Sequence, residues 1–384
     1  MQFPRNEIIS LLDERLDYNI AESTNKDLIL KEIMTEEFID ELKSLKLEYG
    51  TSQGNPQLRS LVSKKIGTLP ENILLTNGAI SGIFLSILCL CELGDEVVSV
   101  QPNFPPTVDL IEGLGFKKKI LQLKFDTKYQ LCINDLLKIV TPRTKLIILV
   151  SPLNPSGTNI DDRLVKTLIE RSEDLPSNCK VLIDETYREA VYGNNKPADS
   201  FAGFSDKIIT VSSLSKCHGA PGLRLGWLSS SDQDFISQAT VAKLNTVISN
   251  SVLDEFVAIK VLEKEEELFC YRREHSRKGL EITQEWLERN NKCVEWIRPD
   301  AGALCCIRLR KEKFNNESVA EFYRAAKDSN IQLAHGNWFG EDKRIFRLGF
   351  GYMDSEDLII ALVKLEEILL KLAANKAFHT DAHS

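Results

Sequence analysis

The stretch SSLSKCHGAPGLRLGW, residues 212–227, places a lysine, Lys216, eight residues before an arginine, Arg224. Small residues and glycines fill the loop between them, and a strand-like run follows. Two neighbouring cations repel each other unless an anion lies between them or one of them loses its charge. The stretch therefore predicts an anionic ligand at this turn and a chemical role for the Lys216 amine.

Composition narrows the classes of protein. The chain has 384 residues and a net charge of −8, which permits two domains of ordinary size and offers no basic surface for nucleic acid. No apolar run approaches the roughly 20 residues of a membrane span. The nine cysteines form no CxxC pair, so we expect neither a disulfide framework nor a zinc site. These features predict a cytoplasmic, metal-free protein without nucleic-acid or membrane partners.

Short apolar runs alternate with helical stretches between about residues 70 and 230. Buried runs separated by helices predict an α/β fold with a mostly parallel, doubly wound sheet. The last connection is too short for a comfortable parallel crossover, so we expect the final strand to run antiparallel. The runs are NILLTNG (72–78), EVVSVQP (96–102), KLIILVSP (145–152), KVLIDET (180–186), KIITVSS (207–213) and LRLGWLS (223–229).

The rest of the chain predicts a second domain. Residues from about 235 to 290 are highly charged and are expected to form a long connecting helix. The strand-like runs GALCCIRLR (302–310) and IFRLGFG (345–351) alternate with amphipathic helices, as in α+β domains. We predict a large domain of residues 46–250 and a smaller α+β domain built from residues 1–45 and 251–384.

Polar residues follow the predicted strands at their carboxyl ends, where open α/β sheets bind ligands. Asp184 ends an otherwise apolar strand, and a carboxylate there is costly unless it meets a cation. Phe104 offers a ring for stacking, and Asn154 and Tyr187 offer donors for a phenolate oxygen. An anion site at a helix start is expected from Gly78 and Ala79, with further donors from Ser213, Ser215 and Arg224.

Anion, cation and flat ring beside an amine describe pyridoxal 5′-phosphate (PLP) bound to Lys216 as a Schiff base. Arg224 would neutralise the phosphate, and Lys216 would lose its charge by joining the cofactor. Asp184 would keep the pyridine nitrogen protonated, so that the ring withdraws electrons from the substrate Cα. Lys216, once displaced, would move the Cα proton.

Seven collinear motifs resemble those of the class I/II aminotransferases, which are fold-type I PLP-dependent enzymes. The resemblance implies that Lys216 forms the Schiff base, that Asp184 and Tyr187 hold the ring, and that Asn154 also contacts it. It further implies a homodimer with shared active sites, in which Tyr49 reaches the neighbouring subunit's phosphate, and it assigns Arg347 to the substrate carboxylate. The motifs are YGTSQGNPQLR (49–59), TNGAISGI (76–83), PNF (102–104), SPLNPSGT (151–158), DETY (184–187), SSLSKCHGAPGLRLGW (212–227) and FRLGFG (346–351).

The resemblance leaves the reaction open. We expect transfer of an amino group between an α-amino acid and a 2-oxo acid. The alternatives are another PLP reaction on an amino acid, as in a C–S β-lyase, a decarboxylase or a cyclising or oxidative enzyme of secondary metabolism, or a non-catalytic PLP-binding regulator. Phe104 stands where the family usually has Tyr or Trp, and YNIAES (18–23) matches no specificity motif. Cys217 and His218, beside the lysine, are expected to be structural.

Overall fold

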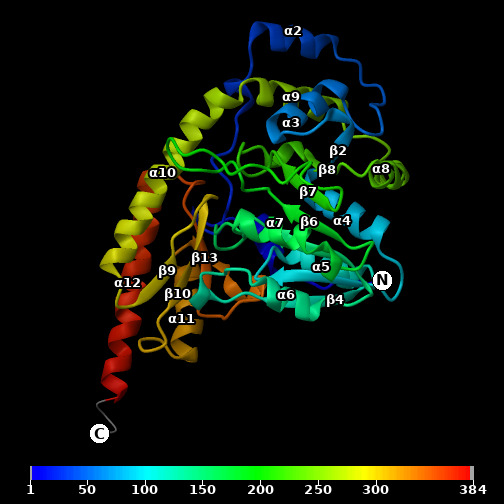
Figure 1. Ribbon diagram of the computed structural model, residues 1–384. Helices are drawn as coiled ribbons and strands as arrows, with labels where there is room; N and C mark the ends of the chain where they lie inside the picture. Colours follow the sequence, from blue (N-terminus) through cyan, green and yellow to red (C-terminus); the bar gives the residue numbers. More distant parts are fainter. Residues whose placement is uncertain (1, 381–384) are drawn as a thin grey trace.

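A seven-stranded sheet forms the centre of the computed structural model, which describes residues 2–380 (Figure 1). The strand order is β2-β8-β7-β6-β5-β3-β4, and only β8 opposes the other strands, as predicted for LRLGWLS. The mostly parallel, doubly wound α/β fold is therefore confirmed. The strands are β2 (Ile73–Thr76), β3 (Glu96–Gln101), β4 (Lys117–Gln122), β5 (Thr144–Val150), β6 (Lys180–Asp184), β7 (Ile208–Ser213) and β8 (Gly226–Ser229).

The edge strand β4 is absent from the sequence prediction. It pairs in parallel with β3, but it begins with three lysines, Lys117, Lys118 and Lys119, and none of its residues is fully buried. Charged side chains on an edge strand discourage pairing with other chains. The same charges remove the apolar pattern by which the buried strands are identified.

Helices cover both faces of the large sheet. Val98 and Ile147 point into one apolar cluster and their neighbours Val97 and Leu146 into another, as alternation along a strand requires. The first cluster lies under α6 and α7, and the second under α4, α5 and α8. The bounds are α4 (Gly78–Leu90), α5 (Pro105–Gly113), α6 (Ile133–Ile139), α7 (Asp162–Glu170) and α8 (Gln233–Val247).

The predicted long helix between residues 235 and 290 is three helices: α8, α9 (Val252–Glu263) and α10 (Glu265–Arg289). Ile248 ends α8 with a positive φ of 64°, which a β-branched residue rarely adopts. Ser251 then caps α9 by accepting a hydrogen bond from the Asp254 amide. A side-chain N-cap favours the start of a new helix at that point. The run of charged residues did not indicate where one helix ends and the next begins.

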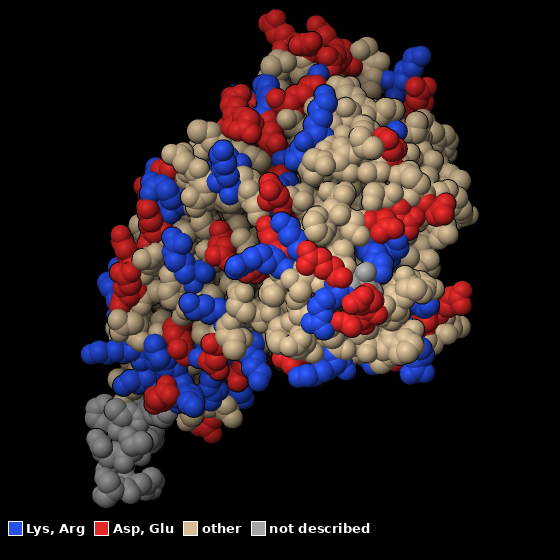
Figure 2. Space-filling view, viewed as in Figure 1, with Lys and Arg blue, Asp and Glu red and all other residues tan. Residues whose placement is uncertain are grey.

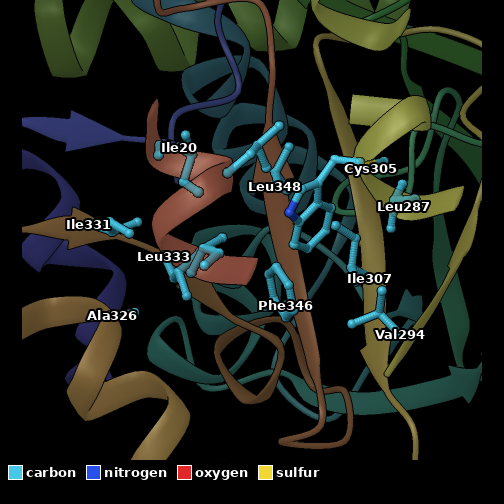
Figure 3. Close-up of a cluster of buried hydrophobic side chains, with 14 of the residues drawn as sticks. Ile20, Leu287, Val294, Cys305, Ile307, Ala326, Ile331, Leu333, Phe346 and Leu348 are labelled. Carbon is cyan, nitrogen blue, oxygen red and sulfur yellow. The ribbon is translucent and has the colours of Figure 1, made fainter. Parts of the chain in front are cut away.

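A second, four-stranded antiparallel sheet has the order β12-β13-β10-β9. Its apolar core contains Phe346, Leu348, Ile307 and Val294, and Ile20 from the start of the chain lies in the same cluster (Figure 3). The helices α10 and α12 lie side by side next to this sheet (Figure 1). The bounds are β9 (Val294–Ile297), β10 (Leu304–Leu309), β12 (Ala334–His335), β13 (Ile345–Gly349), α11 (Asn316–Asp328) and α12 (Ser355–Thr380).

The N-terminal segment spreads over several elements. Strand β1 (Tyr18–Asn19) pairs in parallel with β11 (Ile331–Gln332). Helix α2 (Glu36–Ser44) packs Phe38 against α9 and α10, whereas Asn6 donates a 3.2 Å hydrogen bond to Asp109 of α5. The division into residues 46–250 and the remainder stays a prediction. The other elements are α1 (Ser10–Asp13), α3 (Pro56–Ile66), η1 (Glu7–Ile9), η2 (Leu30–Glu32), η3 (Pro70–Asn72), η4 (Phe125–Thr127), η5 (Ser172–Asp174), η6 (Pro221–Leu223) and η7 (Gly336–Phe339).

Candidate active site

Lys216 lies in a loop that leaves β7 and returns as β8. The amide of Leu214 donates to the carbonyl of Leu225 at 3.1 Å, which closes the base of this loop. The N-terminal segment binds its outer side, since the Asn25 amide donates to the Lys216 carbonyl at 3.2 Å and the Leu28 amide to the Gly219 carbonyl at 2.7 Å. The backbone on which the lysine stands is therefore fixed from two directions.

The Lys216 amine contacts two residues of the N-terminal segment. Its Nζ donates to Glu22 Oε1 and to Ser23 Oγ, each at 3.2 Å. Ser23 Oγ also lies 2.9 Å from the Tyr187 hydroxyl. Burial lowers the pKa of Lys216, but Glu22 and Tyr187 raise it by more, so the net pKa lies above its ordinary value. The Lys216 amine is therefore an ammonium that Glu22 and Ser23 hold by hydrogen bonds.

The predicted anion site comes together where α4 begins. Gly78 has a φ of +74°, and a Cβ there would lie 2.5 Å from Arg224 Nη2. A Cβ on Gly226 would lie 2.6 Å from the Gly78 carbonyl carbon and 2.7 Å from the Ala79 nitrogen. Arg224 Nη1 donates to Ser215 Oγ at 3.3 Å. Glycine at both positions thus leaves a cradle of backbone amides beside a guanidinium, which suits a phosphate.

Ser213 and Asp184 end neighbouring parallel strands, β7 and β6. Ser213 Oγ accepts from the Ser215 amide at 3.3 Å. Asp184 Oδ1 accepts from the Thr186 amide at 2.9 Å and from its hydroxyl at 2.5 Å. Burial raises the pKa of Asp184, and the Thr186 hydrogen bonds oppose that shift only in part. Within residues 2–380 no cationic side chain pairs with Asp184, so a protonated ring nitrogen would supply the missing partner.

Arg347, on β13, is buried and reaches the rim of the large sheet. Its Nη1 donates to Asn154 Oδ1 at 3.0 Å and its Nη2 to the Ala21 carbonyl at 2.6 Å. Its Nε is buried and has no hydrogen-bond partner in the described chain. Burial lowers the pKa of Arg347, while Tyr187 and Glu22 raise it. A carboxylate that accepts from Nε would satisfy this donor.

Two predicted residues, Phe104 and Tyr49, form no hydrogen bond or ring contact with Lys216 within residues 2–380. Phe104 precedes α5 at the end of β3, and its amide donates to Asn103 Oδ1 at 2.6 Å. Phe104 at this position could stack on a cofactor ring, but its own ring packs against no other aromatic ring within residues 2–380. Tyr49 is 81% exposed and has no recorded contact with the cradle of its own chain. Both roles stay predictions.

Comparison with known proteins identifies the family. The family model "Aminotransferase class I and II" matches residues 17–365. The chain belongs to the class I and II aminotransferases. The predictions of the family and of a PLP-dependent enzyme are thereby confirmed at the level of the family.

Individual relatives of this aminotransferase carry different names. It is 29% identical over 354 residues to a (5-formylfuran-3-yl)methyl phosphate transaminase of Methanocaldococcus jannaschii, covering 88% of each chain. It is 25% identical over 313 residues to capreomycidine synthase of Streptomyces vinaceus, covering 81% of this chain and 78% of that one. A PLP-dependent aminotransferase structure from Streptococcus suis superposes with a TM-score of 0.86 at 27% identity, covering 97% and 99%.

Sequence reasoning missed Glu22 and Ser23 as site residues. They belong to YNIAES (18–23), which matches no specificity motif, and nothing in its pattern indicates contact with Lys216. The contact depends on a parallel pairing of β1 with β11, more than 300 residues away. Only the tertiary structure brings these residues to the aminotransferase site.

Behind the lysine loop lies a cluster of Glu189, His218 and Glu265, whose ligand atoms all fall within 4.8 Å of one another. Lys65 Nζ pairs with Glu189 at 2.6 Å and also with Glu265, and His218 Nε2 lies 2.6 Å from Glu265. Arg188 Nη2 also pairs with Glu189 at 2.7 Å, so Lys65 and Arg188 supply two cations for the two carboxylates. Cys217, adjacent to it, packs against Ala190 and Phe269.

Proposed function

We propose that this protein uses PLP, covalently linked to Lys216, to transfer an amino group between an α-amino acid and a 2-oxo acid. The observation that carries the proposal is the position of Lys216 and Arg347 around one short segment. Lys216 contacts Glu22 and Ser23, and Arg347 contacts Ala21 with its buried Nε unsatisfied. An amine and a guanidinium that contact the same segment, residues 21–23, offer partners for the two ends of an α-amino acid.

The residues present fit the cofactor. Arg224, the Gly78 and Ala79 amides, Ser213 and Ser215 would hold the phosphate. Asp184 would hold the ring nitrogen, and Tyr187 and the Asn154 amide would hold the ring oxygen. When bound, PLP supplies an aldehyde that joins an amine and a ring that withdraws electrons from the Cα bonds.

The chain's own groups then perform the proton work. Arg347 would grip the substrate carboxylate and so fix the orientation of the Cα–H bond. The Lys216 amine would take the proton from the substrate Cα and hold it for delivery to the cofactor carbon that keeps the amino group. Ser23, which contacts both Lys216 Nζ and Tyr187, would hold the displaced amine close to its place of action.

We further propose a homodimer in a reducing compartment such as the cytoplasm. Helix α8 exposes Val241, Leu244 and Val247, and few charged side chains lie over this part of the surface (Figure 2). Exposed Tyr49 would cross such an interface to the partner's phosphate. All nine cysteines, which lie within the described residues, are unpaired. Among residues 2–380 no helix has the length and apolarity to cross a membrane.

A second candidate is a different PLP reaction on an amino acid, such as a cyclisation. The similarity to capreomycidine synthase, over about four-fifths of both chains, favours keeping it. It would use the same lysine and the same electron withdrawal. The difference lies in which bond at Cα is held perpendicular to the ring.

A panel of amino donors with pyruvate and 2-oxoglutarate tests the proposal. We expect a donor to convert the cofactor to its amine form, seen by absorbance and by mass. Borohydride should trap the cofactor on wild-type protein and not on Lys216→Ala. Amino-acid consumption without formation of the amine form would favour the second candidate. A reducible link in Lys216→Ala would refute the assignment of the lysine.

A further inference from the structure

Glu22 is an acidic residue in a site whose proposed chemistry needs only an amine and an arginine. Its Oε1 accepts from the amides of Ser23 at 2.7 Å and Thr24 at 3.1 Å, as well as from Lys216. The Glu22 side chain is largely buried, with 22% exposed. Three donors on one oxygen hold the carboxylate in a fixed direction beside the reacting amine.

Its charge is balanced by two groups that the reaction uses. Burial would raise the pKa of Glu22, but the charges of Lys216 and Arg347 and the Ser23 amide lower it to about 2. Glu22 is therefore ionised at neutral pH. Lys216 gives up its own positive charge when it joins the cofactor, and Arg347 is neutralised when a substrate carboxylate binds. Glu22 then remains as a largely buried anion without a counter-ion, which is unfavourable.

A second acidic residue strengthens the negative field on this side. Asp27 lies close enough for the charge of Glu22, together with burial, to raise its pKa. The nearby cations are already partly used, because Arg272 Nη2 pairs with Glu32 at 3.4 Å and Lys26 pairs with Asp354. Asp27 therefore adds a second carboxyl group on the side of the site where Glu22 lies.

We propose that Glu22 makes this site select amino acids whose side chain carries a positive charge, an ammonium or a guanidinium, over neutral and acidic ones. The inference rests on the proposed function, since it takes Lys216 and Arg347 as the positions of the substrate amine and carboxylate. Glu22 contacts Lys216 and its charge acts on Arg347, so an amino acid held by these two groups lies in the field of Glu22. A cationic side chain there replaces the positive charges that Glu22 loses when the cofactor and the substrate carboxylate bind. A second carboxylate on the substrate adds repulsion with Glu22.

The test compares near-isosteric amino acids on the holoenzyme, with the absorbance change of the bound cofactor as the measure of binding. The probes are arginine against citrulline, lysine against norleucine, and glutamate against glutamine. We expect the cation of at least one of the first two pairs to bind about tenfold more tightly than its neutral partner, and glutamate more weakly than glutamine. Glu22→Gln should reduce these preferences to within about threefold, and Glu22→Asp should keep part of them.

Glu14→Gln is the matched control, because Glu14 belongs to the same segment but pairs with Lys327 on the surface. It should keep the wild-type preferences. Wild-type enzyme that binds the neutral or acidic partner as tightly as the cationic one would overturn the inference while leaving the proposed function intact, and this result needs no variant to fold. Unchanged preferences in Glu22→Gln would also overturn it. A holoenzyme whose spectrum no amino acid changes would overturn both.

Discussion

Arg347 Nη1 donates a 3.0 Å hydrogen bond to Asn154 Oδ1, which joins a strand of the small sheet to a loop of the large one. Arg347 lies on β13 of the small sheet, and Asn154 follows β5 of the large one. The same guanidinium lies 4.9 Å over the ring of Phe339 and donates to the Ala21 carbonyl. One side chain thus couples the proposed substrate clamp to the residue proposed to touch the cofactor ring.

Arg347→Lys should lower kcat/KM at least about tenfold, because an ammonium cannot form the two parallel hydrogen bonds of a guanidinium. The variant should retain PLP, since Arg347 has no proposed contact with the cofactor. Steady-state kinetics and cofactor absorbance measure the two effects separately. Arg344→Lys, in the adjacent turn, is the control. Normal turnover by Arg347→Lys would mean that another group holds the carboxylate.

Asp184→Asn should lower kcat by at least about a hundredfold while most of the cofactor stays bound. An amide can hydrogen-bond the ring nitrogen but cannot keep it protonated. The cofactor-free variant should not be less stable than cofactor-free wild type, because the substitution removes a buried carboxylate without a cationic partner. Turnover, cofactor content and thermal midpoints test this. A wild-type rate would show that Asp184 does not control the ring.

Leu244→Glu should convert a dimer into monomers and weaken PLP binding. Leu244 is 48% exposed on the apolar face of α8, and a charge there would be buried in a dimer interface. Light scattering after gel filtration measures the mass, and dialysis measures cofactor retention. Leu370→Glu, at an equally exposed leucine of α12, should remain dimeric. A monomeric wild-type protein that holds PLP would contradict the shared site and the role of Tyr49.

His335 should make the protein lose stability in mild acid. Its ring stacks between Tyr323 and Trp338, with centroids 3.8 Å and 4.8 Å away, and burial lowers the pKa of His335 to about 4. The unfolded chain, with an ordinary histidine pKa, binds a proton as the pH falls below about 6.5, whereas the folded chain does not. Stability is therefore fully present above that pH and is lost between about 6.5 and 4.

His335→Phe keeps the stacking and removes the titration. Urea unfolding at pH 7 and pH 4.5 should show a smaller acid-induced loss for the variant, by about 1–3 kcal/mol. Parallel losses in the two proteins would mean that His335 titrates normally in the folded state.

The sequence was sufficient for features that depend on local pattern. The buried strands β5, β6 and β7 and the antiparallel β8 follow from apolar runs and connection lengths, and the cradle residues follow from their positions at strand ends. The sequence pattern did not predict β4, because the lysines of this strand mask the apolar pattern of a strand. It also did not predict the end of α8, which depends on the positive φ of a single residue, Ile248. Glu22 could not be found because its contact with Lys216 exists only after the ends of the chain have paired.

That pairing has a consequence for synthesis. Residues 18–20 are made early, but these partners are made late: Tyr18 and Asn19 pair with β11, and the Gly349 amide donates to the Ile20 carbonyl at 2.8 Å. A nascent chain can complete its seven-stranded sheet while residues 18–20 still lack these two partners. The segment that brings Glu22 and Ser23 to Lys216 is therefore anchored at its start by residues made late. A translation product that stops before β13 would contain Lys216 beside a finished sheet but would lack Arg347 and the Gly349 contact.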